Sequence, residues 1–307
     1  MRNLLRLVAM FWLSLHVHAV LGQTTEQKIV ETEKQQIEDT ISLLDERGQS
    51  SKQAMMNPFS ISQHKRNYIL PVTFATRPNT QVIENLTNEN VDNFEAKYQI
   101  SVKLPLYVYP QSASGFYMGF TAKSYWQVYN SERSKPFRAT EYEPEVFYEW
   151  RNEVSILGFK FNSLQFGLNH QSNGRSNRLS RSWNRLFAAA IFSDESSFYY
   201  VKTWYRIPEK AKETPDSPTG DDNPDITRYL GNIELGYGTN WGEFKFTGLL
   251  RNNLRSDNKG SFELNVTYPL STKYDLLFQY FNGYGDSLID YNRQQQRIGL
   301  GVQLKFF

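Results

Sequence analysis

Apolar and polar residues alternate along several segments of this chain, and this period of two restricts most strongly what it can fold into. In residues 94–106 every even position carries an apolar or aromatic residue, while Glu95, Lys97 and Lys103 occupy odd positions. Residues 262–270 and 298–304 repeat the pattern. Because successive side chains of a β-strand point to opposite faces, each segment is predicted to be a strand with one apolar and one polar face.

Two classes of all-β protein contain such strands, soluble β-sandwiches and transmembrane β-barrels. Aromatic residues make up 15% of the chain, and many stand at the ends of apolar rows, including Tyr107, Tyr109, Trp150, Trp204 and Trp241. A barrel carries such aromatic girdles at the two membrane interfaces, whereas a sandwich has no need of them. Membrane helices are excluded for the mature chain, because no stretch of about 18 apolar residues follows the first part of the sequence. The sequence therefore predicts an all-β, antiparallel, transmembrane β-barrel.

The predicted barrel occupies residues 67–307. About 240 residues, at about 20 per strand and connection, give about 12 strands, an even number as in outer-membrane barrels. Residues 1–22 combine a basic start, an apolar stretch and small residues at the end, which is typical of a cleaved signal peptide and not of an anchor helix. Residues 23–66 are rich in Glu, Gln, Lys and Ser, and are predicted to form a polar N-terminal extension on the periplasmic side.

The composition excludes several kinds of site. Cysteine is absent, so the chain has no disulfide, thiol nucleophile or cysteine-bound metal. Of four histidines, His16 and His18 lie in the predicted signal peptide, which leaves His64 and His170. His64, in the polar stretch before the first strand, is predicted to be an exposed loop residue. The formal net charge of +2 gives no electrostatic reason to expect a nucleic-acid partner.

Polar residues interrupt an apolar row in the segment of residues 169–185, which reads NHQSNGRSNRLSRSWNR. The row of Leu164, Phe166 and Leu168 continues with His170 and Ser172, so both are predicted to lie on the lipid-facing side. Polar groups on that side are costly and are functional candidates by default.

A third polar residue is predicted beside them. Arg185 marks the lumen row of the following strand, so Asn184 faces outward, and a hairpin would bring it next to His170. Ser172, His170 and Asn184 then supply a nucleophile, a base and an amide that orients the base, since a hydroxyl needs an adjacent base and the base needs a fixed tautomer. The alternative is a set of interfacial polar residues that bind lipid headgroups.

These residues resemble the signature of the outer membrane phospholipase A family. The resemblance rests on NH at 169–170, SNGRS at 172–176, SRSWNR at 180–185, DDNPDIT at 221–227 and SLIDYN at 287–292, in the family's order. It implies a 12-stranded barrel that hydrolyses acyl esters of phospholipids and lysophospholipids and is activated by calcium and by dimerisation. The family's nucleophile, base and orienting amide match Ser172, His170 and Asn184.

The resemblance also implies how charge is stabilised. The oxyanion would be held by the backbone N–H of Gly174 together with calcium-polarised water. The catalytic calcium would take oxygens from Arg175, through its carbonyl, and Ser180, with a contribution from the partner subunit's Ser134. A second, monomer-associated calcium position matches Asp222. Without the resemblance, Asp222 belongs to an acidic turn of a kind that is usually a solvated loop and less often an ion site.

We therefore expect a calcium-dependent phospholipase A1/A2 and lysophospholipase in the outer membrane of a Gram-negative bacterium, acting as a reversible homodimer. Other classes of protein remain alternatives. A passive porin or a structural barrel would share the fold but give no reason for His170, Ser172 and Asn184 on the outer face. An outer-membrane protease would carry its acidic and histidine residues around the barrel mouth.

Overall fold

The computed structural model describes residues 61–79, 91–109, 111–131, 135–156, 158–214 and 216–305. The predicted signal peptide, most of the predicted extension and the predicted calcium ligand Ser134 lie outside the described residues. Within the described ranges, none of the helices has the length and apolar character needed to cross a membrane.

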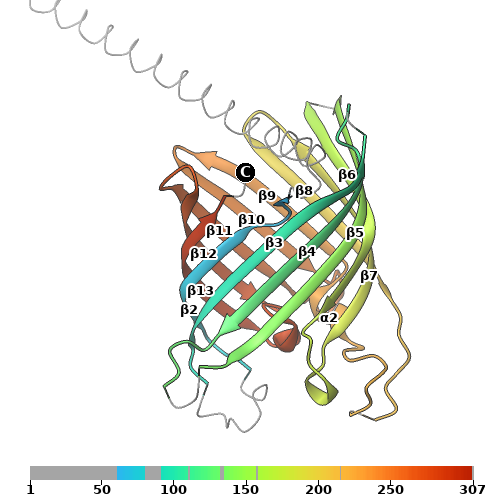
Figure 1. Cartoon of the computed structure of the whole chain (residues 1–307), viewed down its shortest axis with the longest axis vertical. Coiled ribbons are helices and arrows are strands. Elements are labelled where there is room, and N and C mark those ends of the chain that lie inside the picture. Colours follow the sequence, from blue (N-terminus) through green and yellow to red (C-terminus); the bar gives the residue numbers. More distant parts are fainter. Residues whose placement is uncertain are drawn as a thin grey trace, which may run out of the picture.

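Most of the described chain is β-strand (Figure 1). The strands are, in chain order, β1 (Ser62–Gln63), β2 (Asn67–Ala75), β3 (Phe94–Val108), β4 (Gly115–Trp126), β5 (Phe137–Ile156), β6 (Phe159–Ser172), β7 (Ser182–Ser193), β8 (Ser197–Ile207), β9 (Ile233–Trp241), β10 (Phe244–Asn252), β11 (Gly260–Pro269), β12 (Tyr274–Gly283) and β13 (Gln295–Leu304). Three short helical turns lie between them, η1 (Asn177–Leu179), α2 (Ile226–Leu230) and η2 (Leu288–Asp290).

The strands form one closed antiparallel sheet. From β3 to β13 each strand pairs with the next in sequence, while β2 pairs with both β3 and β13, so the twelve strands β2 to β13 close into a barrel. The two-residue β1 adds to this barrel by pairing with β3. The predicted 12-stranded antiparallel barrel is therefore confirmed.

The two ends of the barrel differ. At the upper end in Figure 1 the strands are joined by short turns, such as residues 194–196 and 270–273. At the lower end lie the longer connections, including residues 173–181 and 208–232, with η1 and α2. Outer-membrane barrels have short periplasmic turns and longer external loops, so the lower end corresponds to the external side.

The outer wall is apolar. Phe94, Ile100 and Leu106 of β3 are 50%, 49% and 57% exposed, as expected for side chains that face lipid. Trp241, at the end of β9, is also exposed, in agreement with an interfacial girdle. Trp204 is an exception to the predicted girdle, because it is only 5% exposed. In β8 it shares the lumen row with Lys202, and it packs edge-on against Trp183 with ring centroids 6.3 Å apart.

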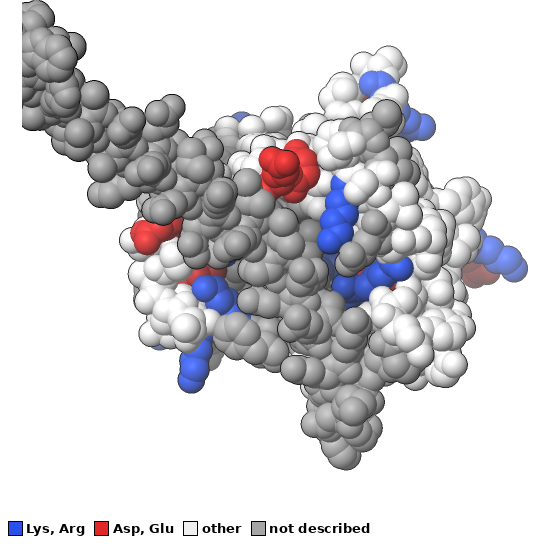
Figure 2. Space-filling model, turned by 90° about the horizontal axis from the view of Figure 1, so that it is seen from above, with Lys and Arg blue, Asp and Glu red and all other residues white. Residues whose placement is uncertain are grey.

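Charged side chains fill the interior. Arg138 of β5 lies 2.6 Å from Asp290 and 2.9 Å from Glu95 of β3, and Arg297 of β13 lies 2.7 Å from Glu95. These side chains are at most 1% exposed, so each charge depends on its partners for solvation. Figure 2, a view onto the short-turn end, shows basic (blue) and acidic (red) side chains within the outline of the barrel.

His64 belongs to this interior, so the prediction that it is an exposed loop residue is wrong. Its side chain is 10% exposed, its Nε2 lies 2.7 Å from Glu145 Oε2, and its ring stacks on Phe147 at 5.3 Å. Gly119 makes room for the ring, since a Cβ at that position would lie 2.9 Å from it. The pairing of β1 with β3 holds this part of the chain against the wall, and no local sequence pattern reveals that contact.

Candidate active site

The predicted triad lies on the outer wall, where β6 meets the long loop at the external end. Strands β6 and β7 pair so that His170 stands opposite Asn184 and Ser172 opposite Ser182, which confirms the predicted hairpin pairing. His170 is exposed, in the same outward row as Leu168. Asn169, which lies between Leu168 and His170 in the sequence, faces the lumen and is 3% exposed.

His170 and Asn184 are hydrogen-bonded to each other. His170 Nδ1 lies 2.8 Å from Asn184 Oδ1. An amide oxygen only accepts, so this contact places the imidazole proton on Nδ1 and leaves the lone pair on Nε2. The ring is thus arranged to accept a proton through Nε2, as a general base requires.

Ser172 lies two residues beyond His170 on the same face. Its Oγ accepts a hydrogen bond from the Gly174 N–H at 3.1 Å. Among the described residues, no hydrogen bond joins Ser172 to His170, and their backbones are about 6.5–7 Å apart by the rise of a strand. Catalytic contacts of this kind are often long in the unliganded state and shorten when substrate binds.

The loop after Ser172 is held by Asn173, which is 6% exposed. Asn173 Oδ1 accepts hydrogen bonds from the N–H groups of Arg175 at 3.2 Å and Arg181 at 2.9 Å, and its Nδ2 donates to the Leu179 carbonyl at 2.7 Å. These hydrogen bonds join the Asn173 side chain to both halves of the loop and so fix the conformation of the loop. Gly174 has φ of 62°, in the left-handed region that favours glycine, and this turn directs its N–H toward Ser172.

The lumen row behind the triad is densely bonded. Arg185 Nε donates to Asn169 Oδ1 at 2.8 Å, and Arg185 Nη2 donates to Glu143 Oε1 at 2.9 Å. Its guanidinium lies 4.1 Å from the ring centroid of Trp183, whose Nε1 donates to Gln171 Oε1 at 2.9 Å. Because inward and outward side chains alternate on one backbone, this network also fixes the outward positions of His170 and Asn184.

A second cluster surrounds Asp222, which is 7% exposed and is not part of a solvated turn. Its Oδ2 accepts hydrogen bonds from Ser180 Oγ at 2.6 Å and Ser182 Oγ at 3.0 Å, while Lys212 Nζ lies 2.6 Å from its Oδ1. Burial raises the pKa of the Asp222 carboxyl, but the bonds from Lys212, Ser180 and Ser182 outweigh it and lower that pKa from its ordinary value. The carboxylate is therefore ionised at neutral pH.

The predicted calcium ligands are only partly brought together. Ser180 and Asp222 are in contact, and the Arg175 backbone is part of the same loop as Ser180. Hydroxyl, carbonyl and carboxylate oxygens suit Ca²⁺, so the donor set fits a hard cation. The described chain holds no group of three or more His, Asp or Glu side chains that could bind a metal. A cation here would thus depend on hydroxyl and carbonyl donors, with Lys212 already neutralising part of the Asp222 charge.

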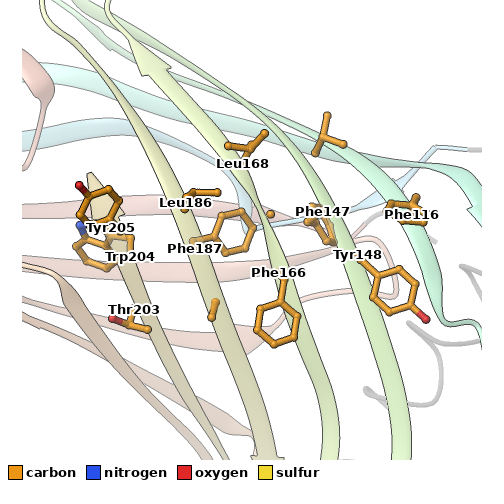
Figure 3. Close-up of a pocket in the computed structure, with 13 residues that line it drawn as sticks. Phe116, Phe147, Tyr148, Phe166, Leu168, Leu186, Phe187, Thr203, Trp204 and Tyr205 are labelled. Atoms are coloured by element: carbon orange, nitrogen blue, oxygen red, sulfur yellow. The ribbon is translucent and has the colours of Figure 1, made fainter. Parts of the chain in front are cut away.

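An apolar groove runs along the outer wall from the triad. A hollow of about 370 Å³ is lined by His170, Asn184, Val146 and Leu168, among others. Val146 and Leu168 also line a neighbouring hollow of about 680 Å³ with Phe166 and other apolar residues. Figure 3 shows residues of β4 to β8 that line this larger hollow. Phe166, Leu168 and Leu186 are exposed on the outer wall, whereas Phe147, Phe187 and Trp204 are buried on the lumen row beneath it. The two hollows form a continuous apolar surface that leads to His170.

Three residues of this region were not predicted from the sequence. Glu209 Oε1 accepts a hydrogen bond from Asn184 Nδ2 at 3.0 Å, and Lys212 and Ser182 contact Asp222. Glu209 and Lys212 come from the loop between β8 and β9. Their only sequence signal is the high polarity of that loop, because no spacing rule connects them to the hairpin.

Comparison with known proteins agrees with this geometry. A family model described as Phospholipase A1 matches residues 44–304. The chain is 36% identical over 252 residues to the phospholipases A1 of Salmonella typhimurium and Escherichia coli strain K12, and the matched part covers 81% of this chain and 82% of each relative.

Solved structures of outer membrane phospholipases are similar to this one, and two of them illustrate the likeness. An active-site mutant of the outer membrane phospholipase A from Escherichia coli gives a TM-score of 0.74 at 34% identity, covering 84% of this chain and 98% of that chain. The Salmonella typhi outer membrane phospholipase dimer with bound calcium gives the same TM-score and coverage at 36% identity. Because a family match over residues 44–304 coincides with this shared fold and sequence identity, the chain belongs to the phospholipase A1 family.

Proposed function

We propose that this protein is a calcium-dependent phospholipase A1/A2 and lysophospholipase of the bacterial outer membrane, which hydrolyses acyl esters of glycerophospholipids. The observation that carries the proposal is the hydrogen bond of 2.8 Å between His170 and Asn184 on a lipid-facing wall. A polar pair at this place is costly unless it has a function. Ser172 lies on the same face, and the apolar groove beside it suits an acyl chain.

The reaction uses Ser172 as nucleophile and His170 as base. Ser172 Oγ attacks the ester carbonyl carbon while His170 Nε2 accepts the hydroxyl proton. The bond between the carbonyl carbon and the glycerol oxygen then breaks, and His170 returns the proton to that oxygen. Water, deprotonated by His170, hydrolyses the acyl-serine and releases a fatty acid. Asn184 keeps the imidazole in the tautomer that these steps need.

Gly174 supplies a donor for the oxyanion. Its N–H is 3.1 Å from Ser172 Oγ. When this oxygen bonds to the carbonyl carbon, the negative charge develops on the carbonyl oxygen attached to that carbon. A donor within hydrogen-bond distance of the nucleophile is therefore within reach of the oxyanion. The left-handed turn at residue 174 is what makes this orientation available.

Calcium would be held by Ser180 and the Arg175 carbonyl, with the partner subunit's Ser134, and at a second position by Asp222. When bound, it supplies positive charge beside the oxyanion and lowers the energy of the tetrahedral state. The related Salmonella typhi protein is a dimer with bound calcium, which supports this assignment. Oxygen donors on the loop of residues 173–181 support it independently.

A homodimer would complete the site. The groove is open on its lipid-facing side, so a second barrel against this wall would enclose an acyl chain. A monomer would lack both that wall and one calcium ligand, which gives an enzyme that is silent until two barrels meet.

The interior argues against a passive porin. Buried ion pairs of Arg138, Arg297, Glu95 and Asp290 connect β3, β5, β13 and η2 across the lumen. A water-filled channel would instead leave its lining charges solvated.

The test is release of free fatty acid from phosphatidylethanolamine micelles by the detergent-solubilised protein, with calcium or with a chelator. Wild type is compared with Ser172→Ala and with Ser176→Ala, an exposed serine of the same loop. We expect calcium-dependent release by wild type and Ser176→Ala, and none by Ser172→Ala. If a folded, cross-linkable dimer supplied with calcium releases no fatty acid, the proposal is wrong.

A further inference from the structure

We propose that Glu209 is a positioning residue for the triad, whose carboxylate selects the orientation of the Asn184 amide. The inference rests on the proposed function of Asn184 as the group that orients His170. It adds a fourth member, from a different loop, to the triad of Ser172, His170 and Asn184, and the hydrogen bonds run from Glu209 through Asn184 to His170.

The Asn184 amide bridges two groups. Its Oδ1 lies 2.8 Å from His170 Nδ1, and its Nδ2 donates to Glu209 Oε1 at 3.0 Å. A carboxylate can only accept when ionised, so the contact with Glu209 requires the nitrogen of the amide on that side. The oxygen is then left to face His170.

The opposite orientation would disable the base. An Asn amide has nearly the same shape when it is turned over, so shape alone does not select one orientation. Turned over, Nδ2 would donate to His170 Nδ1, and the imidazole proton would move to Nε2. Nε2 could then no longer accept the proton of Ser172. Glu209 opposes this state, because the amide oxygen would face its carboxylate.

The chain around Glu209 is held in place on both sides. Asn184 pairs in register with Ile207, the last residue of β8, so Glu209 stands just beyond the paired strand. Arg206 Nη2 donates to Asp221 Oδ1 at 2.5 Å, and the Asp221 N–H donates to the Lys210 carbonyl at 2.7 Å. An isolated bridge between Ala211 and Asp221 continues this connection. The loop thus has a defined path beside Asn184.

The negative charge of Glu209 should also stabilise the positively charged imidazolium of His170. A neutral Asn stabilises the imidazolium that forms during catalysis less than a carboxylate would. Glu209 places a negative charge one amide beyond the ring, where a polarised amide transmits part of its effect. In this arrangement the Asn184 amide stands between the histidine and a carboxylate that contacts the histidine directly in a Ser-His-Asp triad.

Glu209→Gln removes the selection while keeping the size of the side chain. The Gln amide can accept from Asn184 Nδ2 or donate to Asn184 Oδ1, so both orientations of Asn184 are satisfied. We expect kcat to fall on the order of tenfold to hundredfold, as for groups that orient a functional histidine, with little change in KM. Glu213→Gln, an exposed carboxylate of the same loop, is the matched control and should keep wild-type kcat. Wild-type kcat in Glu209→Gln would overturn the proposal.

The tautomer of His170 is a readout that does not depend on activity. His64 and His170 are the two histidines that follow the predicted signal peptide, so ¹⁵N-histidine spectra contain two rings, and a His64→Gln variant assigns them. We expect the Nδ1–H tautomer of His170 in wild type and a mixture with Nε2–H in Glu209→Gln. An unchanged tautomer would overturn the proposal. A changed tautomer in a protein that proves inactive on phospholipids would support the positioning role and contradict only the proposed reaction.

Asn184→Asp tests the same contact from the other side. It places a second carboxylate about 3 Å from Glu209, and like charges at that distance disfavour ionisation of both. We expect low activity in Asn184→Asp and recovery when Glu209→Gln is added. A residue that only tethers the loop would give losses that add, which would contradict the proposal.

Discussion

The two faces of the hairpin formed by β6 and β7 differ sharply in how their polar groups are held. On the lumen face, Arg185, Asn169 and Gln171 are connected to Trp183 and to β5 by several hydrogen bonds. On the lipid face, His170 and its neighbours have few polar contacts, and apolar side chains stand on either side of them. The proposed catalytic side chains thus make few polar contacts of their own. Their positions depend on the hydrogen-bonded lumen row of the same two strands.

The difference has an energetic reason. A buried charge without its partner is costly, so the lumen face must be fully paired for the barrel to be stable. A polar group on the lipid-facing row does not stabilise the barrel and is costly there, so its role is sought in the chemistry of the site. Strands β6 and β7 therefore each carry one row of side chains that stabilises the barrel and one row that contains the proposed catalytic residues.

Ser172→Ala should give the largest difference between an effect on activity and an effect on stability. We expect fatty acid release to fall by about 10³-fold or more, because the nucleophile is lost. The thermal midpoint should stay at the wild-type value, since Ser172 makes one hydrogen bond from Gly174. Activity and circular dichroism melting measured on the same sample check both parts, and a large drop in the midpoint would contradict the proposed division of the two faces.

Arg185→Met should lower both the stability of the barrel and the activity. It removes the bonds from Arg185 to Glu143 and Asn169, while Glu143 keeps Lys65 Nζ at 2.6 Å and Asn169 Nδ2 at 2.8 Å. The loss should therefore lie near the lower end of the about 3–5 kcal/mol that removal of one member of a buried ion pair costs. Since the same row positions His170 and Asn184, activity should fall as well, although Arg185 faces away from substrate. Urea unfolding and fatty acid release measure these effects, and full activity in the variant would show that the outer row is positioned independently.

Gly174→Ala should have a smaller effect on stability. A left-handed conformation costs about 1–2 kcal/mol for a residue with a Cβ, and this Cβ would lie 3.1 Å from the Tyr142 ring. We expect kcat to fall about tenfold, because a displaced N–H stabilises the oxyanion less well. Gly242→Ala, which also has a positive φ but lies in a turn at the opposite end, is the control that should lose stability without losing kcat.

Arg178→Ala should have the smallest effect. Arg178 pairs with Asp216 at 3.0 Å, but the two side chains are 73% and 56% exposed. Exposed ion pairs contribute little because solvent screens them. We expect wild-type melting and activity, and a clear loss of either would mean that the loop of residues 173–181 depends on this contact.

Much of the candidate site follows from local patterns. The alternation of β6 and β7 places His170, Ser172 and Asn184 on one face, and the turn between them brings β7 back beside β6. The exceptions are residues whose position depends on another part of the barrel. The residue type of Trp204 predicts a place at the membrane interface, but Trp204 lies on the same face of β8 as Lys202 and therefore points into the lumen.

The sequence by itself determined which residues share a face of each strand, because a period of two is a property of the local backbone. Only the tertiary structure decided which groups meet across the barrel. His64 meets Glu145 from 81 residues away, and Glu209 meets Asn184 from 25 residues away. Such contacts depend on the closure of the sheet and on the path of a long loop, and neither leaves a periodic signal in the sequence.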